Sequence, residues 1–484
     1  RKWRLEIQER IDYKGNIIKQ LDDNSVREAA KKLKLEGVES IAVCFLHSYL
    51  NPTHEKAAAN IVRQVFPEAF LSISSEIRPE FREYFRMSTT VLNACLMPII
   101  KHYLDKLDIE LKTTGITTAL HIMESSGGIM TSETAKEKPA YLLESGPAAG
   151  VIAAAELGKI AGYENVISLD MGGTTAKAGL IEKGEPKLVT EYEVGGVAHA
   201  GYVLKGSGYP LKLPVVDLVE IGAGGGSVGW VDEGGVLHVG PRSAGAEPGP
   251  ACYRAGGIEP TITDANLVLG RINPEYFLGG EMKLSAKAAY EAIENRVSGP
   301  LGKNVLDAAR GIVEVANSNM VRALRIVSVD RGYDPRDFAL VAFGGAGPMH
   351  AAKLAEELKT PIVMIPLSPG VTSALGMLLT DIRHDFVSTK IQKMETVDPE
   401  TLNSYYQELE KQALELLRKE GVAEASTILA KSADLRYSGQ AYELNIPVPS
   451  GRLTESHLAM LRESFHATHE RVYGHSAASE PVEL

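Results

Sequence analysis

The sequence is poor in cysteine and has no long apolar run. Its three cysteines, Cys44, Cys95 and Cys252, lie far apart and form no C-x-x-C pair. This usage indicates a reducing compartment, so we expect a cytoplasmic protein without a disulfide framework or a zinc knuckle. No stretch of about 18 apolar residues occurs, so the sequence predicts no membrane span. The charged first residues lack the apolar stretch and small-residue cleavage site of a signal peptide.

Positive charge is in deficit. Asp and Glu number 62 and Lys and Arg 51, so the net charge is −11. This balance argues against a general nucleic-acid-binding role. Hydrophobic residues make up 44% of the chain, which is enough for several cores and excludes disorder. At roughly 150 residues per domain, 484 residues predict about three domains.

Glycine is what the sequence has in quantity. There are 46, and many lie in clusters between apolar runs: 127–128, 172–173, 222–226, 256–257 and 344–347. Glycine adopts positive φ and allows another backbone to approach closely, so these clusters predict tight turns or ligand loops.

Helical and strand patterns alternate along the chain, which predicts an α/β fold. The predicted helices are 25–35, 53–65, 80–112, 148–158, 286–297, 308–329, 349–358 and 399–420. The predicted strands are 41–45, 119–123, 166–169, 178–181, 338–342, 362–365, 433–437 and 442–448. Between about 185 and 300 the chain is rich in Gly, Pro and short strands, which is typical of an inserted subdomain.

The strands 166–169 and 178–181 enclose the turn Asp170-Met171-Gly172-Gly173-Thr174-Thr175, which predicts a β-hairpin. Adjacent glycines expose consecutive N–H groups that can bind an anion, and threonine hydroxyls add donors to phosphate oxygens. An aspartate at the strand end can hold Mg²⁺ directly or through water. A simple glycine-rich turn explains the same residues.

A second loop, Phe343-Gly344-Gly345-Ala346-Gly347-Pro348, joins a predicted buried strand to a helix. Its glycines allow a flat ring to lie against the backbone, and a helix N-terminus favours anionic groups. The loop matches neither G-x-G-x-x-G nor G-x-x-x-x-G-K-[ST], so it supports neither a Rossmann site nor a P-loop. A structural turn is the alternative.

The order of these pieces resembles the second half of the actin, sugar-kinase and heat-shock-chaperone ATPase fold, which has ribonuclease H-like lobes. The resemblance narrows to the hydantoinase/oxoprolinase family, A-type subunit, close to N-methylhydantoinase (ATP-hydrolysing). It is carried by residues 169–178, 219–227, 240–253, 263–266 and 343–350. Two departures exist. No first phosphate loop of the form Asp-x-Gly-Gly-Thr occurs near the N-terminus, and Thr175-Ala176-Lys177 stands where many relatives have Ser-Thr-Asp.

The resemblance implies a domain layout in which the first lobe is truncated and the second is nearly complete. Residues 1–140 would be the remainder of the first lobe. Residues 141–185 and 301–385 would form the second lobe, interrupted by the inserted subdomain 186–300, and 386–484 would begin a C-terminal α/β region. The segment 144–150 would be a helix crossing between lobes, and 373–377 the start of a returning one. The Arg1 start and the strand-like end at 481–484 lead us to expect a fragment lacking both family termini.

The resemblance also implies a site and a reaction. Gly172, Gly173, Thr174 and Thr175 would bind phosphate, and residues 344–347 (Gly344, Gly345, Ala346 and Gly347) would take the adenosine side of ATP. Asp170 would orient Mg²⁺ or its water, and Asp170 with Thr174 would be the catalytic pair. The implied enzyme is an ATP-dependent hydrolase that opens a hydantoin or a lactam such as 5-oxoproline, with a B-type hydantoinase subunit as partner in a heteromer.

Two other functions stay open at this point. An ATP-dependent ketone carboxylase would likewise use ATP to phosphorylate an oxygen, in this case the oxygen of an enolate. A nucleotide-driven switch would bind ATP without turning over any cyclic amide.

Further residues have open roles. The loop 222–227, with Asp217 and Glu220 nearby, fits an anion site or a tight structural loop equally well, and Lys177 could meet phosphate or point to solvent. Asp264 is interpreted as a helix N-cap, with an acid/base or metal role as the alternative. Cys252 has no paired base and is interpreted as a buried structural thiol. The remaining candidates are histidines: His350, expected to support the adenosine-type loop, and His466, His469 and His475, interpreted as structural rather than metal ligands.

Overall fold

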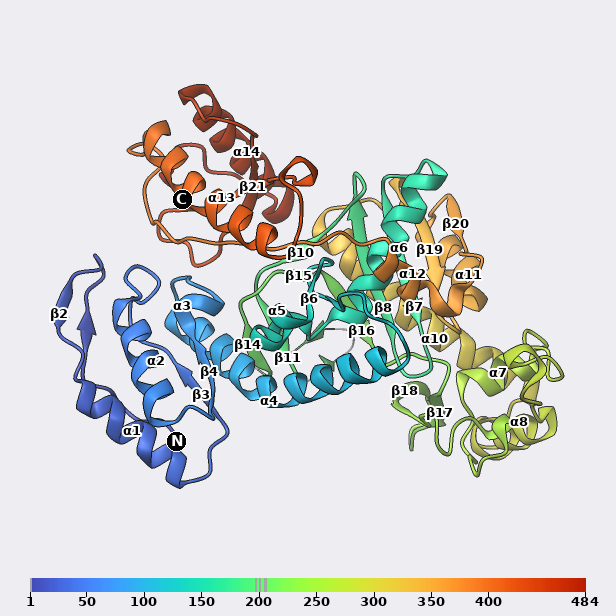
Figure 1. Cartoon of the computed structure of the whole chain (residues 1–484). Helices are drawn as coiled ribbons and strands as arrows, with labels where there is room; N and C mark the ends of the chain where they lie inside the picture. The colour runs from blue at the N-terminus through green and yellow to red at the C-terminus, as the bar shows by residue number, and fades with distance from the viewer. Residues whose placement is uncertain (1, 196–197, 200–201, 204–206) are drawn as a thin grey trace.

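The computed structural model of the protein describes residues 2–195, 198–199, 202–203 and 207–484. It has the predicted α/β fold. Figure 1 shows an N-terminal unit on the left, a C-terminal unit at the top and a central body that extends to the right. Among the described residues, no helix is long and apolar enough to cross a membrane.

The N-terminal unit is a small α/β layer. Strand β3 (Ser40–Val43) pairs in parallel with β4 (Phe70–Ile73), and α1 (Asp23–Leu35) and α2 (Thr53–Val65) pack on them. The further elements up to the central sheet are β1 (Arg10–Ile11), β2 (Ile17–Lys19), α3 (Ser74–Ile77), α4 (Glu83–Thr113), β5 (His121–Met123), β6 (Ile129–Thr131) and α5 (Ser132–Glu137). The long helix α4 runs from this unit along the central body (Figure 1).

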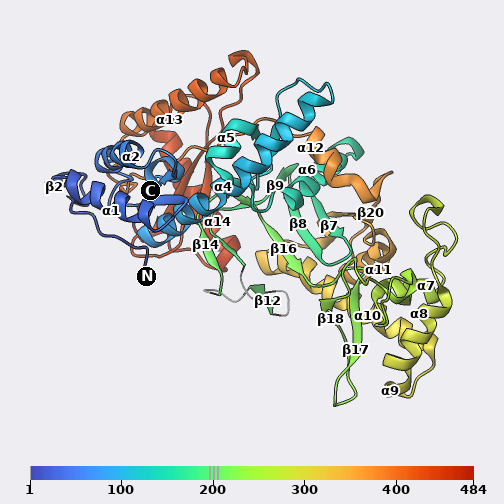
Figure 2. The same cartoon turned by 60° about the horizontal axis from the view of Figure 1, so that its bottom comes forward.

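A six-stranded sheet forms the centre of the molecule. Its strands lie in the order β16 (Leu218–Ile221), β8 (Ala176–Glu182), β7 (Val166–Met171), β19 (Ala339–Phe343) and β20 (Ile362–Met364), with β9 (Glu185–Pro186) beside β8. Strand β7 is antiparallel to β8 and parallel to β19, so the β7–β8 hairpin tip and the end of β19 lie at the same edge. Figure 2 shows β7 and β8 of this sheet, with α6 and α12 beside them.

Helices cover both faces of this sheet. Alternate residues of β7, such as Leu169, enter the core formed with α10 (Val305–Val327) and α11 (Pro348–Leu358). The other residues face α6 (Ser145–Ala161). This alternation follows from the two-residue period of a strand, and it places the side chain of Asp170 on the α6 face.

Helix α6 crosses α12 (Thr372–Leu378) at very short range. A Cβ added to Gly376 would lie 1.9 Å from the carbonyl oxygen of Ala149. A Cβ on Gly150 would lie 2.8 Å from the ring of Phe343. The small residues of α6 therefore let α12 and the end of β19 approach its backbone.

The remaining elements complete the central body and the C-terminal unit. Between β9 and α10 the structure has β10 (Leu188–Val189), β11 (Tyr192–Val194), β12 (Ala198–His199), β13 (Tyr202–Val203), β14 (Tyr209–Leu211), β15 (Val215–Val216), β17 (Ser227–Val231), β18 (Leu237–Ser243), α7 (Ile262–Val268), α8 (Ala286–Ile293) and α9 (Gly299–Leu301). The C-terminal unit contains α13 (Pro399–Lys419), β21 (Lys431–Tyr437), β22 (Leu444–Val448), α14 (Glu455–Tyr473) and β23 (Val482–Glu483).

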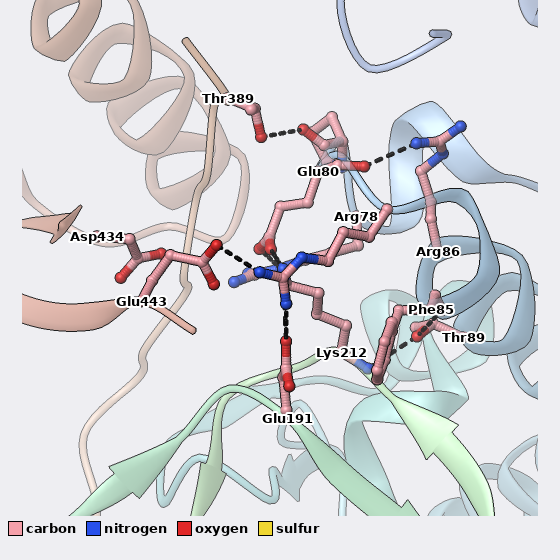
Figure 3. Close-up of polar contacts among 12 residues, drawn as sticks. Arg78, Glu80, Phe85, Arg86, Thr89, Glu191, Lys212, Thr389, Asp434 and Glu443 are labelled. Atoms are coloured by element: carbon pink, nitrogen blue, oxygen red, sulfur yellow. Dashed lines mark hydrogen bonds and ion pairs between the residues drawn. The ribbon is translucent and has the colours of Figure 1, made fainter. Parts of the chain in front are cut away.

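A charged junction joins these units. The guanidinium of Arg82, which precedes α4, pairs with Glu191 at 2.9 Å and with Glu443 of the C-terminal unit at 2.7 Å. Figure 3 shows Glu191 and Glu443 approaching from different chain segments, with Lys212 and Glu80 beside them. Lys212 pairs with Glu80 at 2.9 Å. A cavity of about 270 Å³ lies at this junction.

A second buried contact ties the C-terminal unit to the central body. His384 Nε2 lies 2.6 Å from Glu420 Oε2, and its Nδ1 lies 4.0 Å from Glu124 Oε1. Glu124 is 1% exposed, and its Oε1 has no hydrogen-bond partner among the described residues. Burial, with the charge of Asp385 adding to it, raises the pKa of Glu124 to about 8.

We expect Glu124→Gln to remove a pH dependence of stability. The pKa of Glu124 is higher in the fold than its usual value of 4.5, so its stabilising contribution is full below pH 4.5 and is lost as pH rises through about 8. At pH 9 the variant should exceed the parent in unfolding free energy by about 2 kcal/mol or more, and the difference should shrink toward pH 5. Urea unfolding at pH 5, 7 and 9 measures this. The exposed residue Glu6, changed to Gln, is the control, and parallel pH profiles for parent and Glu124→Gln would contradict the prediction.

Candidate functional site

The predicted hairpin is present and its tip is open to solvent. Strands β7 and β8 extend to Met171 and Ala176, so the tip is the four-residue turn 172–175. The Gly172 N–H donates to the Thr175 carbonyl oxygen at 3.1 Å and closes the turn. Gly173 and Thr174 are exposed. The N–H groups of both are without a backbone acceptor among the described residues.

Two glycine-rich loops hold this tip through main-chain hydrogen bonds. The N–H groups of Gly225 and Gly226 donate to the carbonyl oxygens of Gly172 and Gly173 at 2.9 and 2.6 Å. The Ala346 N–H donates to the Met171 carbonyl oxygen at 2.9 Å. The hairpin, the loop 222–227 and the loop 344–347 are therefore one assembly.

Gly224 shows why the loop 222–227 is glycine-rich. A Cβ at Gly224 would lie 2.5 Å from backbone atoms of Gly173 and Thr174. Such contacts are not made in real structures, so a side chain there would push this loop away from the tip. This geometry assigns a bracing role to the loop 222–227, which is one of the two interpretations that the sequence left open.

Asp170 lies at the base of the hairpin, next to the second glycine loop. A Cβ at Gly344, whose φ is +80°, would lie 2.4 Å from Asp170 Oδ1. Burial raises the pKa of the Asp170 carboxyl group, and the charge of Lys177 opposes this. Among the residues with described positions, none donates a hydrogen bond to this carboxylate. A cation would therefore relieve its desolvation.

These residues fit a phosphate group and a magnesium ion. Open N–H groups and a threonine hydroxyl are donors for phosphate oxygens. No group of three or more His, Cys, Asp and Glu side chains that could hold a metal occurs in the part of the chain that the structure describes. Mg²⁺ does not need one, because it keeps several waters and takes one or two carboxylates together with phosphate oxygens. Asp170 can supply such a carboxylate.

The loop 344–347 presents the exposed Gly345 rather than a free helix N-terminus. Gly345 is exposed, and a Cβ there would meet nothing within 4 Å. The first N–H groups of α11 are already used, since Met349 and His350 donate to Ala346 and Gly347 at 3.2 and 3.1 Å. The geometry therefore suits a ring lying on the loop better than an anion at the helix end.

Charged residues line the α6 face beside the hairpin. Lys177 Nζ lies 3.2 Å from Glu220 Oε1 and 3.3 Å from Thr175 Oγ1. Tyr192 donates its hydroxyl to Glu144 Oε1 at 3.0 Å, and burial raises the pKa of Glu144. Neither Glu144 nor Tyr192 was predicted as a site residue, because they come from a helix terminus and a short strand without a motif.

Two of the other acidic candidates have structural roles. Asp217 pairs with Arg331. Asp264 is not the N-cap of α7, as the sequence suggested. Thr261 is the N-cap, and Asp264 is the third residue of a capping box that also accepts the N–H groups of Ala251 and Cys252. The N-cap prediction was wrong by three residues because Thr261 and Asp264 bond to each other reciprocally.

The cysteine and histidine candidates are buried or engaged with neighbours. Cys252 is fully buried, and burial raises the pKa of its thiol. His350 is buried against Asn317, with Nδ1 2.7 Å from Asn317 Oδ1, and burial lowers its pKa to about 4. The other three histidines make ring contacts or hydrogen bonds within the C-terminal unit: His466, His469 and His475.

Comparison with family models identifies the class. The hydantoinase/oxoprolinase model matches residues 86–386, the model of that family's N-terminal region matches 1–66, and the model of its C-terminal domain matches 389–483. The chain belongs to the hydantoinase/oxoprolinase family. The expectation that the chain lacks both family terminal regions is corrected to this extent: residues 1–66 match the family's N-terminal region and residues 389–483 match its C-terminal domain.

Particular relatives can then be named. The chain is 46% identical over 484 residues to an uncharacterised protein of Methanocaldococcus jannaschii, covering all of this chain and 69% of the relative. It is 38% identical over 478 residues to the caprolactamase subunit alpha of Pseudomonas jessenii, covering 98% and 67%. The chain thus spans about two thirds of the length of these relatives.

Two solved structures share the fold. The ATP-dependent caprolactamase of Pseudomonas jessenii superposes with a TM-score of 0.89 at 37% identity, covering 99% of this chain and 68% of that one. A nucleotide-free acetone carboxylase superposes with a TM-score of 0.72 at 29% identity, covering 99% and 68%.

Proposed function

We propose that this chain is the ATP-hydrolysing subunit of a cyclic amide hydrolase that opens a hydantoin or a lactam. The main support for this proposal is the hairpin tip, which has open N–H groups and is braced by two glycine loops beside the half-buried Asp170. The likeness to an ATP-dependent caprolactamase supports it. We further propose that the six-stranded sheet, with the helices that cover its two faces and the crossing helices α6 and α12, forms one lobe of an actin-like ATPase.

The reaction that we propose begins with phosphoryl transfer. An amide is stabilised by resonance, so its carbon is a poor electrophile until the carbonyl oxygen carries a good leaving group. The γ-phosphoryl group of ATP passes to that oxygen and ADP leaves. Water adds at carbon, and the ring C–N bond then breaks with its electron pair going to nitrogen, which takes up a proton. A second water hydrolyses the resulting acyl phosphate to carboxylate and phosphate. Positioning and charge stabilisation supply most of the rate in such transfers.

Each residue of the site has a role in this proposal. The main-chain N–H groups of Gly173 and Thr174 and the hydroxyls of Thr174 and Thr175 bind phosphate oxygens. Gly172, whose N–H donates to the Thr175 carbonyl oxygen, shapes the turn instead. Asp170 holds Mg²⁺ or one of its waters, and the ion neutralises charge on the phosphates when bound. The loop 344–347 contacts the adenosine. We propose that a B-type subunit completes the amide site, since the caprolactamase relative is itself named as a subunit.

The domain layout remains a proposal. We assign 1–140 to the first lobe, 141–185 and 301–385 to the second lobe, 186–300 to the insertion and 386–484 to the C-terminal region. The charged junction around Arg82 would then lie where the first lobe, the insertion and the C-terminal region meet.

The test uses the purified chain with its B-type partner, ATP and Mg²⁺. ADP release is measured with caprolactam, hydantoin or 5-oxoproline, each with and without bicarbonate. Amide-dependent ADP release and a ring-opened product in the absence of bicarbonate are expected. ATP binding with no stimulation by any cyclic amide would overturn the proposal and favour a nucleotide-driven switch.

A ketone carboxylase is the second candidate, and the superposition with acetone carboxylase favours it. It predicts ADP release that depends on a ketone and on bicarbonate. Acetone and acetophenone, added to the same assay, therefore separate the two functions.

A further inference from the structure

Lys177 brings an ammonium group to the edge of the phosphate hairpin. Its Nζ lies 3.3 Å from the hydroxyl of Thr175 at the tip. Lys177 on β8 is directly opposite Asp170 on β7 and Glu220 on β16, so the three side chains form one row across the sheet. The neighbouring residues Leu169, Ala178 and Val219 enter the core on the α10 side, so the row is on the α6 side.

Glu220 fixes where that ammonium lies. The distance from Lys177 Nζ to Glu220 Oε1 is 3.2 Å, and the side chains are 24% and 45% exposed. A pair this exposed contributes little to stability, about 0 to 1 kcal/mol. Its effect is instead on geometry, because it holds a flexible four-carbon chain against the hairpin, where a bound phosphate would meet it.

We propose that Lys177 is a catalytic residue of the phosphoryl transfer and that Glu220 is the residue that positions it. The proposal rests on the function proposed above. In the step, the bond from the γ-phosphorus to the ADP oxygen breaks, and a bond from the amide carbonyl oxygen to phosphorus forms. ADP leaves with the bonding electron pair. Lys177 keeps its proton throughout, and its ammonium stabilises the negative charge on the non-bridging phosphoryl oxygens.

Nucleotide binding tests this without turnover. A charge-assisted hydrogen bond to the γ-phosphoryl group exists with ATP and not with ADP. Lys177→Met should therefore raise the Kd for ATP about tenfold and leave the Kd for ADP within about twofold, since such bonds contribute about 1.5 kcal/mol or more. Calorimetry of the chain with MgATP and MgADP measures both. Unchanged affinity for ATP, or equal weakening of ATP and ADP, overturns the proposal.

Turnover gives a second test. In the assay with the B-type partner, Lys177→Met should lower kcat about 100-fold, and Lys177→Arg should restore part of it because the charge is kept. Glu220→Gln should lower kcat about tenfold, and adding it to Lys177→Met should cost nothing more, since Glu220 acts through Lys177. The matched control is Lys183→Met, an exposed position in the turn that follows β8, which should leave kcat and both affinities unchanged.

The two proposals fail separately. If the parent chain shows no amide-dependent ADP release, the proposed cyclic amide hydrolysis is wrong. The ratio of the Kd values for ATP and ADP, compared between the parent and Lys177→Met, still tests whether Lys177 contacts the γ-phosphoryl group. If the parent is active and Lys177→Met retains its kcat, the role of Lys177 falls and the function stands.

Discussion

Asp170→Asn is expected to lower substrate-dependent ATP hydrolysis at least about 100-fold. The asparagine keeps the size of the side chain but removes the negative charge at the base of the hairpin, beside Gly344. Among the described residues, no group of three or more His, Cys, Asp and Glu side chains could hold the ion in its place. Loss of Asp170 should therefore weaken the hold on Mg²⁺, and the Mg²⁺ concentration for half-maximal rate should rise.

The assay is ADP release as a function of Mg²⁺ concentration, with saturating ATP. Asp23→Asn, an exposed position in the first turn of α1, is the matched control and should leave the rate unchanged. Because the substitution is nearly isosteric, the unfolding temperature should change little. An Asp170→Asn variant with the parent rate and the parent Mg²⁺ dependence would show that Asp170 does not serve the metal.

Gly376→Ala is expected to destabilise the protein by about 3 kcal/mol or more. The added methyl would lie 1.9 Å from the Ala149 carbonyl oxygen and 2.8 Å from its carbonyl carbon, so α12 must move away from α6. Helix propensity alone would favour alanine over glycine by about 1 kcal/mol, so the sign of the measured change decides between the two effects.

Urea unfolding followed by circular dichroism measures the change. The control is Gly370→Ala, just before α12, where a Cβ would meet nothing within 4 Å. This control should change stability by less than about 0.5 kcal/mol. If Gly376→Ala is as stable as its control, the close crossing of α6 and α12 is not a determinant of the fold.

Local patterns predicted most of the elements and the hairpin. The helix 53–65 has the predicted bounds in the structure, because an amphipathic run follows directly on a proline. The hairpin was predictable because Gly172 and Gly173 interrupt two apolar strands that pair with each other. These features depend on residues that are close in sequence.

The interlocking of the site was not predictable in this way. The hydrogen bonds from Gly225 and Gly226 to the hairpin join segments that are far apart in the chain. The sequence of a glycine cluster does not indicate which distant segment it will contact. The same holds for the contact of Glu144 with Tyr192. The buried group of Glu124, His384 and Glu420 draws on three separate elements, and none of these residues stands in a motif.

The main-chain bonding of the hairpin has a consequence for how its chemistry can change. Because the Gly172 and Gly173 carbonyls are held by backbone donors, the shape of the tip does not depend on which side chains stand at 174, 175 and 177. Those positions can therefore be randomised together in a library without dismantling the loop assembly. On such a scaffold the backbone fold can stay the same while the side chains that determine specificity change.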